Sequence, residues 1–181
     1  ARTDALTEIP NRLAFIEAAT LELERARRQG RPFTLVFADV DGLKRVNDRH
    51  GHGQGDRLLV AVAETLGAGT RAVDAVARIG GDEFGLVLAE TDAEEAEAVL
   101  HRLRVEREAC VARGGWSAGH SVGAATFRTP PGSVADMMAR ADALMYEAKR
   151  EGRGAVRFAV FGGGPDAGPP GGPRDADAAR G

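Results

Sequence analysis

Hydrophobic side chains recur along the chain at two spacings, and these spacings predict alternating helices and strands. Apolar residues three or four positions apart predict helices over residues 11–30, 58–66, 96–110 and 133–152. Short apolar runs predict strands over residues 33–40, 73–79, 84–88, 117–127 and 155–161. The order α-β-α-β-β-α-β-α-β is typical of an α/β fold with a mixed central β-sheet flanked by helices.

Several boundaries rest on cap residues. Asn11 and Ser133 are expected to be N-caps, and Gly30 and Gly152 are expected to end the helices that these residues begin. Polar residues 41–57 are assigned to neither a helix nor a strand.

Composition places these elements in one globular domain with a hydrophobic core. Of 181 residues, 43% are hydrophobic and 28% are charged. We predict that the domain spans residues 1–160 and that the Gly/Pro/Ala-rich residues 161–181 form a flexible tail or linker. Because the chain begins with Ala1 and not with methionine, we treat it as a module that longer proteins can contain.

Net charge and cysteine content limit the ligands and the cellular compartment that we expect for this chain. The net charge of -3 provides no overall basic field, so no nucleic-acid partner is expected, and local cations must hold any phosphate ligand. The single cysteine, Cys110, excludes an intrachain disulfide and is expected to be a core residue in a reducing compartment. No apolar run has the length of a membrane span.

The stretch RIGGDEFGLVL, residues 78–88, interrupts an apolar run with two glycines and two acids. One interpretation is a tight Gly80-Gly81 turn in an antiparallel hairpin inside the sheet, with Asp82 and Glu83 at its solvated tip. The other is that glycine, which has no Cβ, lets a ligand lie against the backbone beside a carboxylate.

A second group of acids follows the strand at residues 33–40. Asp39 and Asp82 would form a magnesium site if their strands are neighbours, with the Val40 carbonyl as a further ligand. The alternative is that Asp39 and Asp41 cap the next helix, and we favour that role for Asp41.

Polar residues after this strand offer contacts to a nucleotide. Asn47 and Asp56 together present donors and acceptors that match a guanine edge, although either residue is also a suitable helix cap. A zinc site at the histidines of this stretch is less favoured, because no cysteine lies nearby. Lys149 and Arg153, four residues apart, either bind phosphate or complement a helix end.

These motifs, in this order, resemble the GGDEF family of bacterial diguanylate cyclases. The resemblance rests on RIGGDEF and DVDGLKRVNDRHGHGQGD, together with DALTEIPNR, SVG and YEAKREGR, and covers about residues 4–160. It implies a fold similar to nucleotide cyclases and polymerase palms, with a ferredoxin-like core. It also implies the conversion of two GTP molecules to cyclic di-GMP and two pyrophosphates.

The resemblance assigns roles to particular residues. Magnesium or manganese would be bound by Asp39, the Val40 carbonyl and Asp82, with Glu83 in support. Asp82 would also accept the proton of the attacking 3'-hydroxyl. The remaining substrate contacts implied by the family are guanine at Asn47 and Asp56, the nucleotide at His52, Gly80 and Gly81, and the triphosphate at Lys44, Lys149 and Arg153.

Regulation is implied as well. RAVD, residues 71–74, matches the register of the family's inhibitory site, so Arg71 and Asp74 would bind cyclic di-GMP, with Arg78 as a helper. Because one chain has one nucleotide site and the product joins two nucleotides, a homodimer is expected. We further expect a cytoplasmic domain of a larger signalling protein with sensor or regulatory domains, of a kind that can be attached to a membrane. The alternative is a catalytically silent module that binds GTP or cyclic di-GMP as a regulatory receptor.

The sequence also departs from the family pattern. Glu8-Ile9 stands where Gly-Leu is usual, which is expected to change how the N-terminal segment joins the core. Gly154 replaces an asparagine and Leu43 an aromatic residue, and neither change removes a chemical group from the site.

Overall fold

The computed structural model describes residues 1–152 and 154–163. In chain order its elements are α1 (Arg12–Gln29), β1 (Phe33–Asp41), α2 (Leu43–His50), α3 (His52–Ala68), β2 (Ala75–Arg78), β3 (Glu83–Leu88), α4 (Ala93–Arg113), β4 (Gly119–Phe127), α5 (Val134–Glu151) and β5 (Val156–Phe161). None of the helices within these residues combines the length and the hydrophobicity of a membrane span.

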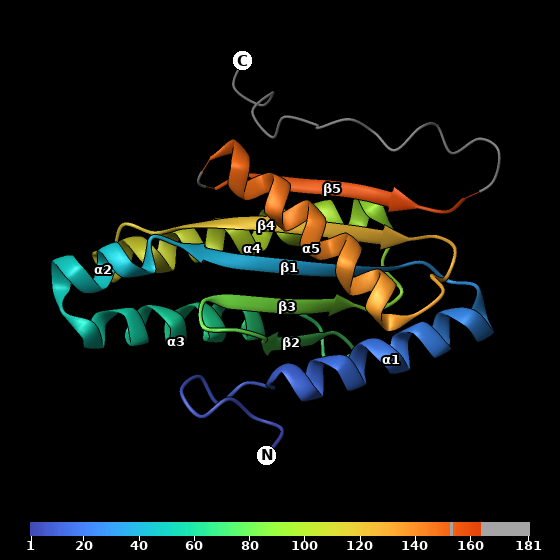
Figure 1. The fold of residues 1–181 in the computed structure, drawn as a ribbon, viewed down its shortest axis with the longest axis horizontal. Coiled ribbons are helices and arrows are strands. Elements are labelled where there is room, and N and C mark those ends of the chain that lie inside the picture. The colour runs from blue at the N-terminus through green and yellow to red at the C-terminus, as the bar shows by residue number, and fades with distance from the viewer. Residues whose placement is uncertain (153, 164–181) are drawn as a thin grey trace.

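The strands form one five-stranded sheet in the order β2-β3-β1-β4-β5 (Figure 1). β1 lies at the centre and is antiparallel to both β3 and β4. β2 and β3 form the predicted antiparallel hairpin, while β4 and β5 are parallel. The mixed sheet is therefore confirmed, but β2 lies at its edge and the hairpin is not enclosed by other strands.

Helices cover both faces of this sheet. α1 and α5 lie on one face, and α3 and α4 lie on the other (Figure 1). Because side chains alternate along β1, Val36 and Ala38 pack toward α3 and α4, whereas Leu35 and Phe37 pack toward α1 and α5. Burial on both faces explains why the strand reads as a continuous apolar run.

The predicted helix caps are present. The Asn11 side chain accepts a hydrogen bond from the Ala14 N–H, and Ser133 accepts one from the Asp136 N–H. Gly30 is the C-cap of α1, with a left-handed φ of 68°, and Gly152 is the C-cap of α5.

The assignment of residues 41–57 was wrong, because most of this polar stretch is helical. α2 buries only Val46, so it lacks the apolar periodicity that reveals a helix in sequence. Gly51, with a φ of 94°, separates α2 from α3. Asp41 does not cap α2: the N-cap is Gly42, without a side-chain bond, and the Asp41 carboxylate accepts a 2.8 Å hydrogen bond from Ser121 Oγ.

Two features at the ends of the domain bear on predictions made from the sequence. Phe161 was predicted both to end the last strand and to begin the tail. It ends β5, and its ring stacks on Phe127 at a centroid distance of 5.4 Å. The rest of the predicted tail from residue 164 onward lies outside the described residues. Near the N-terminus, Glu8 has a φ of 59°, a conformation that costs a side-chain-bearing residue free energy and suits glycine.

Candidate active site

The candidate site lies where β1 ends and β3 begins. Antiparallel pairing places Asp39 of β1 opposite Glu83 of β3. One residue further along, the Val40 N–H donates a 2.9 Å hydrogen bond to the Asp82 carbonyl. A shared cation site was predicted on the condition that the strands at Asp39 and Asp82 are neighbours. Asp39 lies in β1 and Asp82 directly precedes β3, and these two strands are paired.

Lys149 reaches the same place from α5. Its Nζ lies 2.7 Å from Asp39 Oδ2, although the two residues are 110 positions apart in sequence. Asp39 is only 5% exposed, whereas 37% of the Lys149 side chain remains exposed. The pair therefore consists of a buried carboxylate and an ammonium group at the rim of the site.

The acids of the site repel one another. Burial raises the pKa of Asp39, the hydrogen bond from Lys149 opposes this rise, and the charge of Asp82 adds to it. Burial also raises the pKa of Glu83, and the charge of Asp39 raises it further. Burial by itself lowers the pKa of Lys149, but the hydrogen bond to Asp39 and the charges of Asp39, Asp82 and Glu83 together outweigh it, so the pKa is raised. An additional cation would relieve this excess of negative charge.

The donor set suits a hard divalent cation such as magnesium, which prefers oxygen ligands and retains positions for water and phosphate. Asp39 and Glu83, paired across the two strands, provide two neighbouring carboxylates. Among the described residues, the Asp82 N–H does not donate a hydrogen bond to the Val40 carbonyl oxygen, so this oxygen is available as a ligand. Within residues 1–152 and 154–163, no three His, Cys, Asp or Glu side chains are grouped to hold an ion by themselves. The site thus fits an ion that arrives with phosphate ligands better than an enclosed zinc.

The loop between β2 and β3 contains the two glycines of the signature. The N–H groups of Ile79 and Gly80 donate to the Glu83 carbonyl at 2.9 and 3.3 Å. Neither glycine has a left-handed φ, and a Cβ on Gly81 would meet nothing within 4 Å. The backbone conformation therefore does not require glycine at position 81, which favours the interpretation that a ligand lies against this bare loop.

Arg78 holds this loop in place. Its Nε and Nη2 donate to the Gly81 carbonyl at 3.1 and 2.6 Å, and its Nη1 donates to Asp4 Oδ1 at 2.9 Å. Burial by itself raises the pKa of Asp4, but hydrogen bonds from Thr7 and Arg78 outweigh it and lower the pKa to about 2. The sequence analysis missed this role of Asp4, although an Asp three residues before a Thr is a local capping pattern.

The predicted guanine-reading residues lie on α2 and α3. Asn47 Oδ1 accepts a 2.8 Å hydrogen bond from the Gly55 N–H, which leaves the Asn47 amide nitrogen as a donor. A Cβ on Gly55 would lie 2.3 Å from Asn47 Oδ1, so glycine is needed for this close approach of the helices. Asp56, His52 and Lys44 are exposed. The contact between Asn47 and Gly55 brings Asn47 near Asp56. It leaves the Asn47 amide N–H groups and the Asp56 carboxylate free to bond a ligand.

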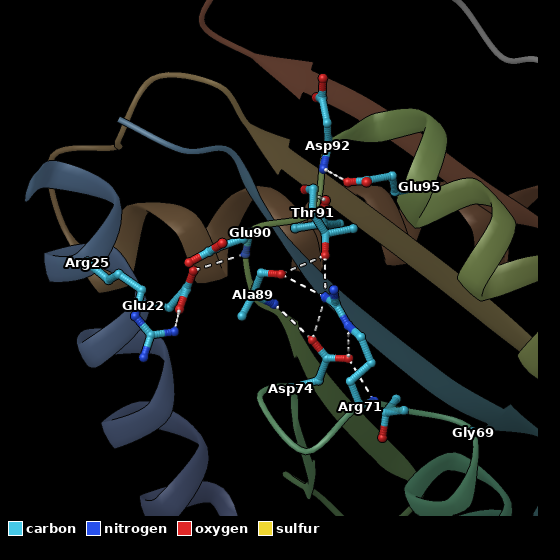
Figure 2. A network of polar contacts seen from close by, with 12 residues as sticks. Glu22, Arg25, Gly69, Arg71, Asp74, Ala89, Glu90, Thr91, Asp92 and Glu95 are labelled. Atoms are coloured by element: carbon cyan, nitrogen blue, oxygen red, sulfur yellow. Dashed lines mark hydrogen bonds and ion pairs between the residues drawn. The ribbon is translucent and has the colours of Figure 1, made fainter. Parts of the chain in front are cut away.

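The predicted inhibitory residues Arg71 and Asp74 form a closed pair (Figure 2). Arg71 Nε and Nη2 donate to the two Asp74 carboxylate oxygens at 3.1 and 2.9 Å. Nη2 also donates to the Ala89 carbonyl at 2.7 Å and lies 2.8 Å from Thr91 Oγ1. Asp74 accepts further bonds from the N–H groups of Arg71 and Ala89, and its side chain is 2% exposed. We call Arg71, Asp74, Ala89 and Thr91 the β2 clasp.

Two other predicted site residues stand apart from these groups. Arg78 lies at the opposite end of β2 from Asp74, so the structure does not bring it together with the β2 clasp. Arg153 lies outside the described residues, and its predicted phosphate contact stays a prediction.

A cavity of about 420 Å³ adjoins the acids along α5. Glu83 and Lys149 line it together with Asp142 and Tyr146, which the sequence analysis did not single out. The spacing of Asp142, Tyr146 and Lys149 places all three on one helix face, and this periodicity was the signal available in the sequence. The cavity gives a phosphate-bearing ligand room beside the Asp39–Lys149 pair.

Comparison with known proteins identifies the family. A family profile described as "Diguanylate cyclase, GGDEF domain" matches residues 1–155. The fold and the intact signature agree with this match, and the chain belongs to the GGDEF family.

Individual relatives are consistent with membership of the GGDEF family. The bifunctional diguanylate cyclase/cyclic di-GMP phosphodiesterase MucR of Pseudomonas aeruginosa is 36% identical over 157 residues, which cover 86% of this chain and 23% of MucR. Diguanylate cyclase DgcP of the same organism is 37% identical over 172 residues, which cover 88% of this chain and 24% of DgcP. The chain therefore spans about a quarter of the length of these two relatives.

Solved structures match the fold over most of the chain. The diguanylate cyclase SiaD of P. aeruginosa, in complex with its activator SiaC, has a TM-score of 0.81 and 38% identity, with 88% of this chain and 62% of that chain covered. The coiled coil and GGDEF domain of DgcB from Caulobacter crescentus, in complex with cyclic di-GMP, has a TM-score of 0.78 and 31% identity, with 87% and 85% covered. The expected palm-like fold of nucleotide cyclases is thereby confirmed.

Proposed function

We propose that this domain is a diguanylate cyclase, which condenses two GTP molecules into cyclic di-GMP and releases two pyrophosphates. The observation that carries the proposal is the buried Asp39 carboxylate, paired in register with Glu83 and contacted by Lys149. Acids that repel one another beside a cavity and a lysine form a site suited to a metal-bound triphosphate. The names of relatives such as DgcP support the same activity.

Magnesium or manganese would be held by Asp39, the Val40 carbonyl and Asp82, with Glu83 in support. When bound, such an ion lowers the charge of the phosphates and favours the deprotonated 3'-hydroxyl. The remaining work falls to residues of the chain.

Asp82 accepts the proton of the 3'-hydroxyl that attacks the α-phosphorus, after which pyrophosphate leaves. Lys44 and Lys149 neutralise the triphosphate as charge shifts onto the leaving group, and Arg153 is proposed to assist them. The bare backbone at Gly80 and Gly81 lies against the nucleotide.

Base selection is assigned to three residues at the α2–α3 junction. The Asp56 carboxylate accepts hydrogen bonds from the guanine N1–H and exocyclic amine, which adenine does not present in the same arrangement. Asn47 uses the amide donor that remains after its bond to Gly55, and the exposed His52 lies beside the nucleotide.

Two domains must meet for one turnover, because each chain offers one nucleotide site and the product contains two nucleotides. In this homodimer the 3'-hydroxyl of each GTP attacks the α-phosphate held by the other domain. We further propose that sensor or regulatory domains control this encounter in a larger protein. The greater length of relatives such as MucR, of which the match covers 23%, supports the presence of further domains.

The β2 clasp is proposed to bind the product as an inhibitor. Arg71 is 54% exposed and offers its remaining guanidinium edge to a guanine or phosphate. The structure of DgcB was solved in complex with cyclic di-GMP, which supports recognition of this ligand within the family. Asp74 is buried, so we propose that it acts by orienting Arg71.

A silent regulatory module is the second candidate function. One relative at 33% identity over 160 residues is the cyclic di-GMP phosphodiesterase NbdA of P. aeruginosa, whose name mentions no cyclase activity. The intact GGDEF signature and the Asp39–Glu83 arrangement favour the enzyme.

One assay separates the two functions. The purified chain is incubated with GTP and magnesium, and cyclic di-GMP and pyrophosphate are quantified by liquid chromatography, with Asp82→Ala as the control. The proposal predicts both products from the unmodified chain and about 1000-fold less of each from the variant. Tight GTP or cyclic di-GMP binding without turnover would support the silent module.

A further inference from the structure

We propose that Lys149 and the divalent ion compete for the Asp39 carboxylate, so that nucleotide phosphates promote ion binding by drawing Lys149 away. This inference rests on the proposed function for the identity of the ligands. It concerns the order and coupling of their binding, which the reaction itself does not specify.

Geometry gives the first argument. Lys149 Nζ lies at hydrogen-bonding distance, 2.7 Å, from Asp39 Oδ2. Asp39 is also a proposed ligand of the ion, together with the Val40 carbonyl. Asp39 is 5% exposed, so few directions of approach are open to it. An ion that binds this carboxylate must therefore share or take the position that the ammonium group holds.

Charge gives the second argument. Lys149 is the ion-pair partner of Asp39 among the described residues, and the acids Asp82 and Glu83 lie close enough to perturb both groups. A divalent ion next to the ammonium group would experience like-charge repulsion, which solvent at the partly exposed Lys149 side chain reduces but does not remove. The two cations therefore exclude one another, although either alone is attracted by the acids.

Lys149 has a place to go when it leaves Asp39. The lysine stem is flexible, and the side chain lines the cavity of about 420 Å³ between Glu83 and α5. A triphosphate in this cavity would bind the ammonium group and remove its charge from the carboxylate. Binding linkage is reciprocal. If the triphosphate raises the affinity for the ion by holding Lys149 away from Asp39, the ion raises the affinity for the triphosphate by the same factor.

The test measures manganese binding without any nucleotide, using the decrease of the free Mn²⁺ electron paramagnetic resonance signal at neutral pH. Lys149→Met and Lys149→Gln remove the competing charge and are expected to bind Mn²⁺ about tenfold more tightly than the parent chain. Lys149→Arg keeps the charge and is expected to bind as weakly as the parent. Arg150→Met, which removes an exposed neighbouring charge from the same helix, is the matched control for general electrostatics.

A second readout is the Mn²⁺-induced rise in melting temperature, which is expected to be larger for the two neutral variants than for the parent. Unchanged Mn²⁺ affinity in both neutral variants, an equal gain in Arg150→Met, or no Mn²⁺ binding in any of the chains would overturn the proposal. Because no turnover is measured, a chain that binds Mn²⁺ in the predicted pattern but forms no cyclic di-GMP would contradict the proposed function and leave this inference supported.

Discussion

The active site and the β2 clasp each contain a buried aspartate paired with a basic residue, yet the two aspartates differ in how well they are satisfied. Asp74 accepts four hydrogen bonds, from two backbone N–H groups and from two guanidinium nitrogens of Arg71. Among the described residues, Asp39 accepts a side-chain hydrogen bond from Lys149 alone, and it faces Asp82 and Glu83.

We interpret this difference as that between an acid that stabilises the fold and an acid suited to bind a ligand. A fully bonded carboxylate stabilises the fold, whereas a buried carboxylate with few partners retains a demand for positive charge. The pKa directions agree: the hydrogen bond to Asp74 raises the pKa of Arg71, while burial raises the pKa of Asp39 despite its lysine partner. We therefore expect substitutions in the active site to affect turnover and substitutions of Asp74 to affect stability.

The largest effect is expected from removing an active-site acid. Asp39→Ala or Asp82→Ala should lower cyclic di-GMP formation by about 1000-fold, because the charge that holds the metal is lost. Circular dichroism should show a retained fold. Turnover close to that of the parent chain in either variant would refute the metal assignment.

Removing Asp74 should instead destabilise the protein. Asp74→Ala leaves buried N–H groups and part of Arg71 without partners, so the free energy of unfolding should fall by about 2–4 kcal/mol in urea titrations. Glu108→Ala, which breaks the exposed Arg104–Glu108 pair on α4, is the control and should cost less than about 1 kcal/mol. An equal decrease in the free energy of unfolding of the two variants would show that the β2 clasp stabilises the fold no more than a surface ion pair does.

Arg71→Ala tests whether the clasp also serves as the inhibitory site. Loss of the exposed guanidinium edge should weaken inhibition by cyclic di-GMP by about tenfold, since charge-assisted hydrogen bonds to the ligand disappear. Initial rates measured with added product report this change at a temperature where the variant is folded. The same inhibition constant in variant and parent would show that Arg71 is not part of the inhibitory site.

Asp56→Ala tests base recognition on the catalytic side. Loss of an acceptor for the guanine edge should reduce the preference for GTP over ATP by about tenfold, measured as the ratio of the two kcat/KM values. Unchanged discrimination would assign guanine recognition to other residues.

The smallest effect is the pH dependence of stability. The folded pKa values of Asp39 and Glu83 are raised, so these groups stabilise the fold below their unfolded pKa values, and this contribution is lost as pH rises through the folded values. In Asp39→Asn, stability should therefore decline less than in the parent as pH increases from about 4 to 7. A steeper decline in the variant would contradict the repulsion described at this site.

Much of the fold was predictable because its elements carry strong local signals. The continuous apolar run of β1, the caps at Asn11 and Ser133, and the hairpin around the two glycines each reflect chemistry within a few residues. α2 was missed for the same reason, since a helix that buries only Val46 has no apolar stripe to detect.

Contacts between segments that lie far apart in the chain were harder to predict from the sequence. The sequence predicted that Asp39 and Asp82 would meet only if their strands paired, and the register of β1 with β3 supplied that fact. The ion pair between Lys149 and Asp39 depends on how α5 crosses the sheet, which local patterns do not encode. The burial of Asp74 likewise follows from the approach of Ala89 and Thr91, residues outside the RAVD motif.

The most direct test of the central claim is the position of the ion itself. Crystals grown with Mn²⁺ and a GTP analogue that carries a non-cleavable group between the α- and β-phosphates would give an anomalous scattering peak. The account predicts this peak beside the carboxylates of Asp39 and Asp82 and the Val40 carbonyl, with Lys149 moved from Asp39 to the phosphates. A nucleotide bound with its ion elsewhere, and Lys149 still paired with Asp39, would contradict it.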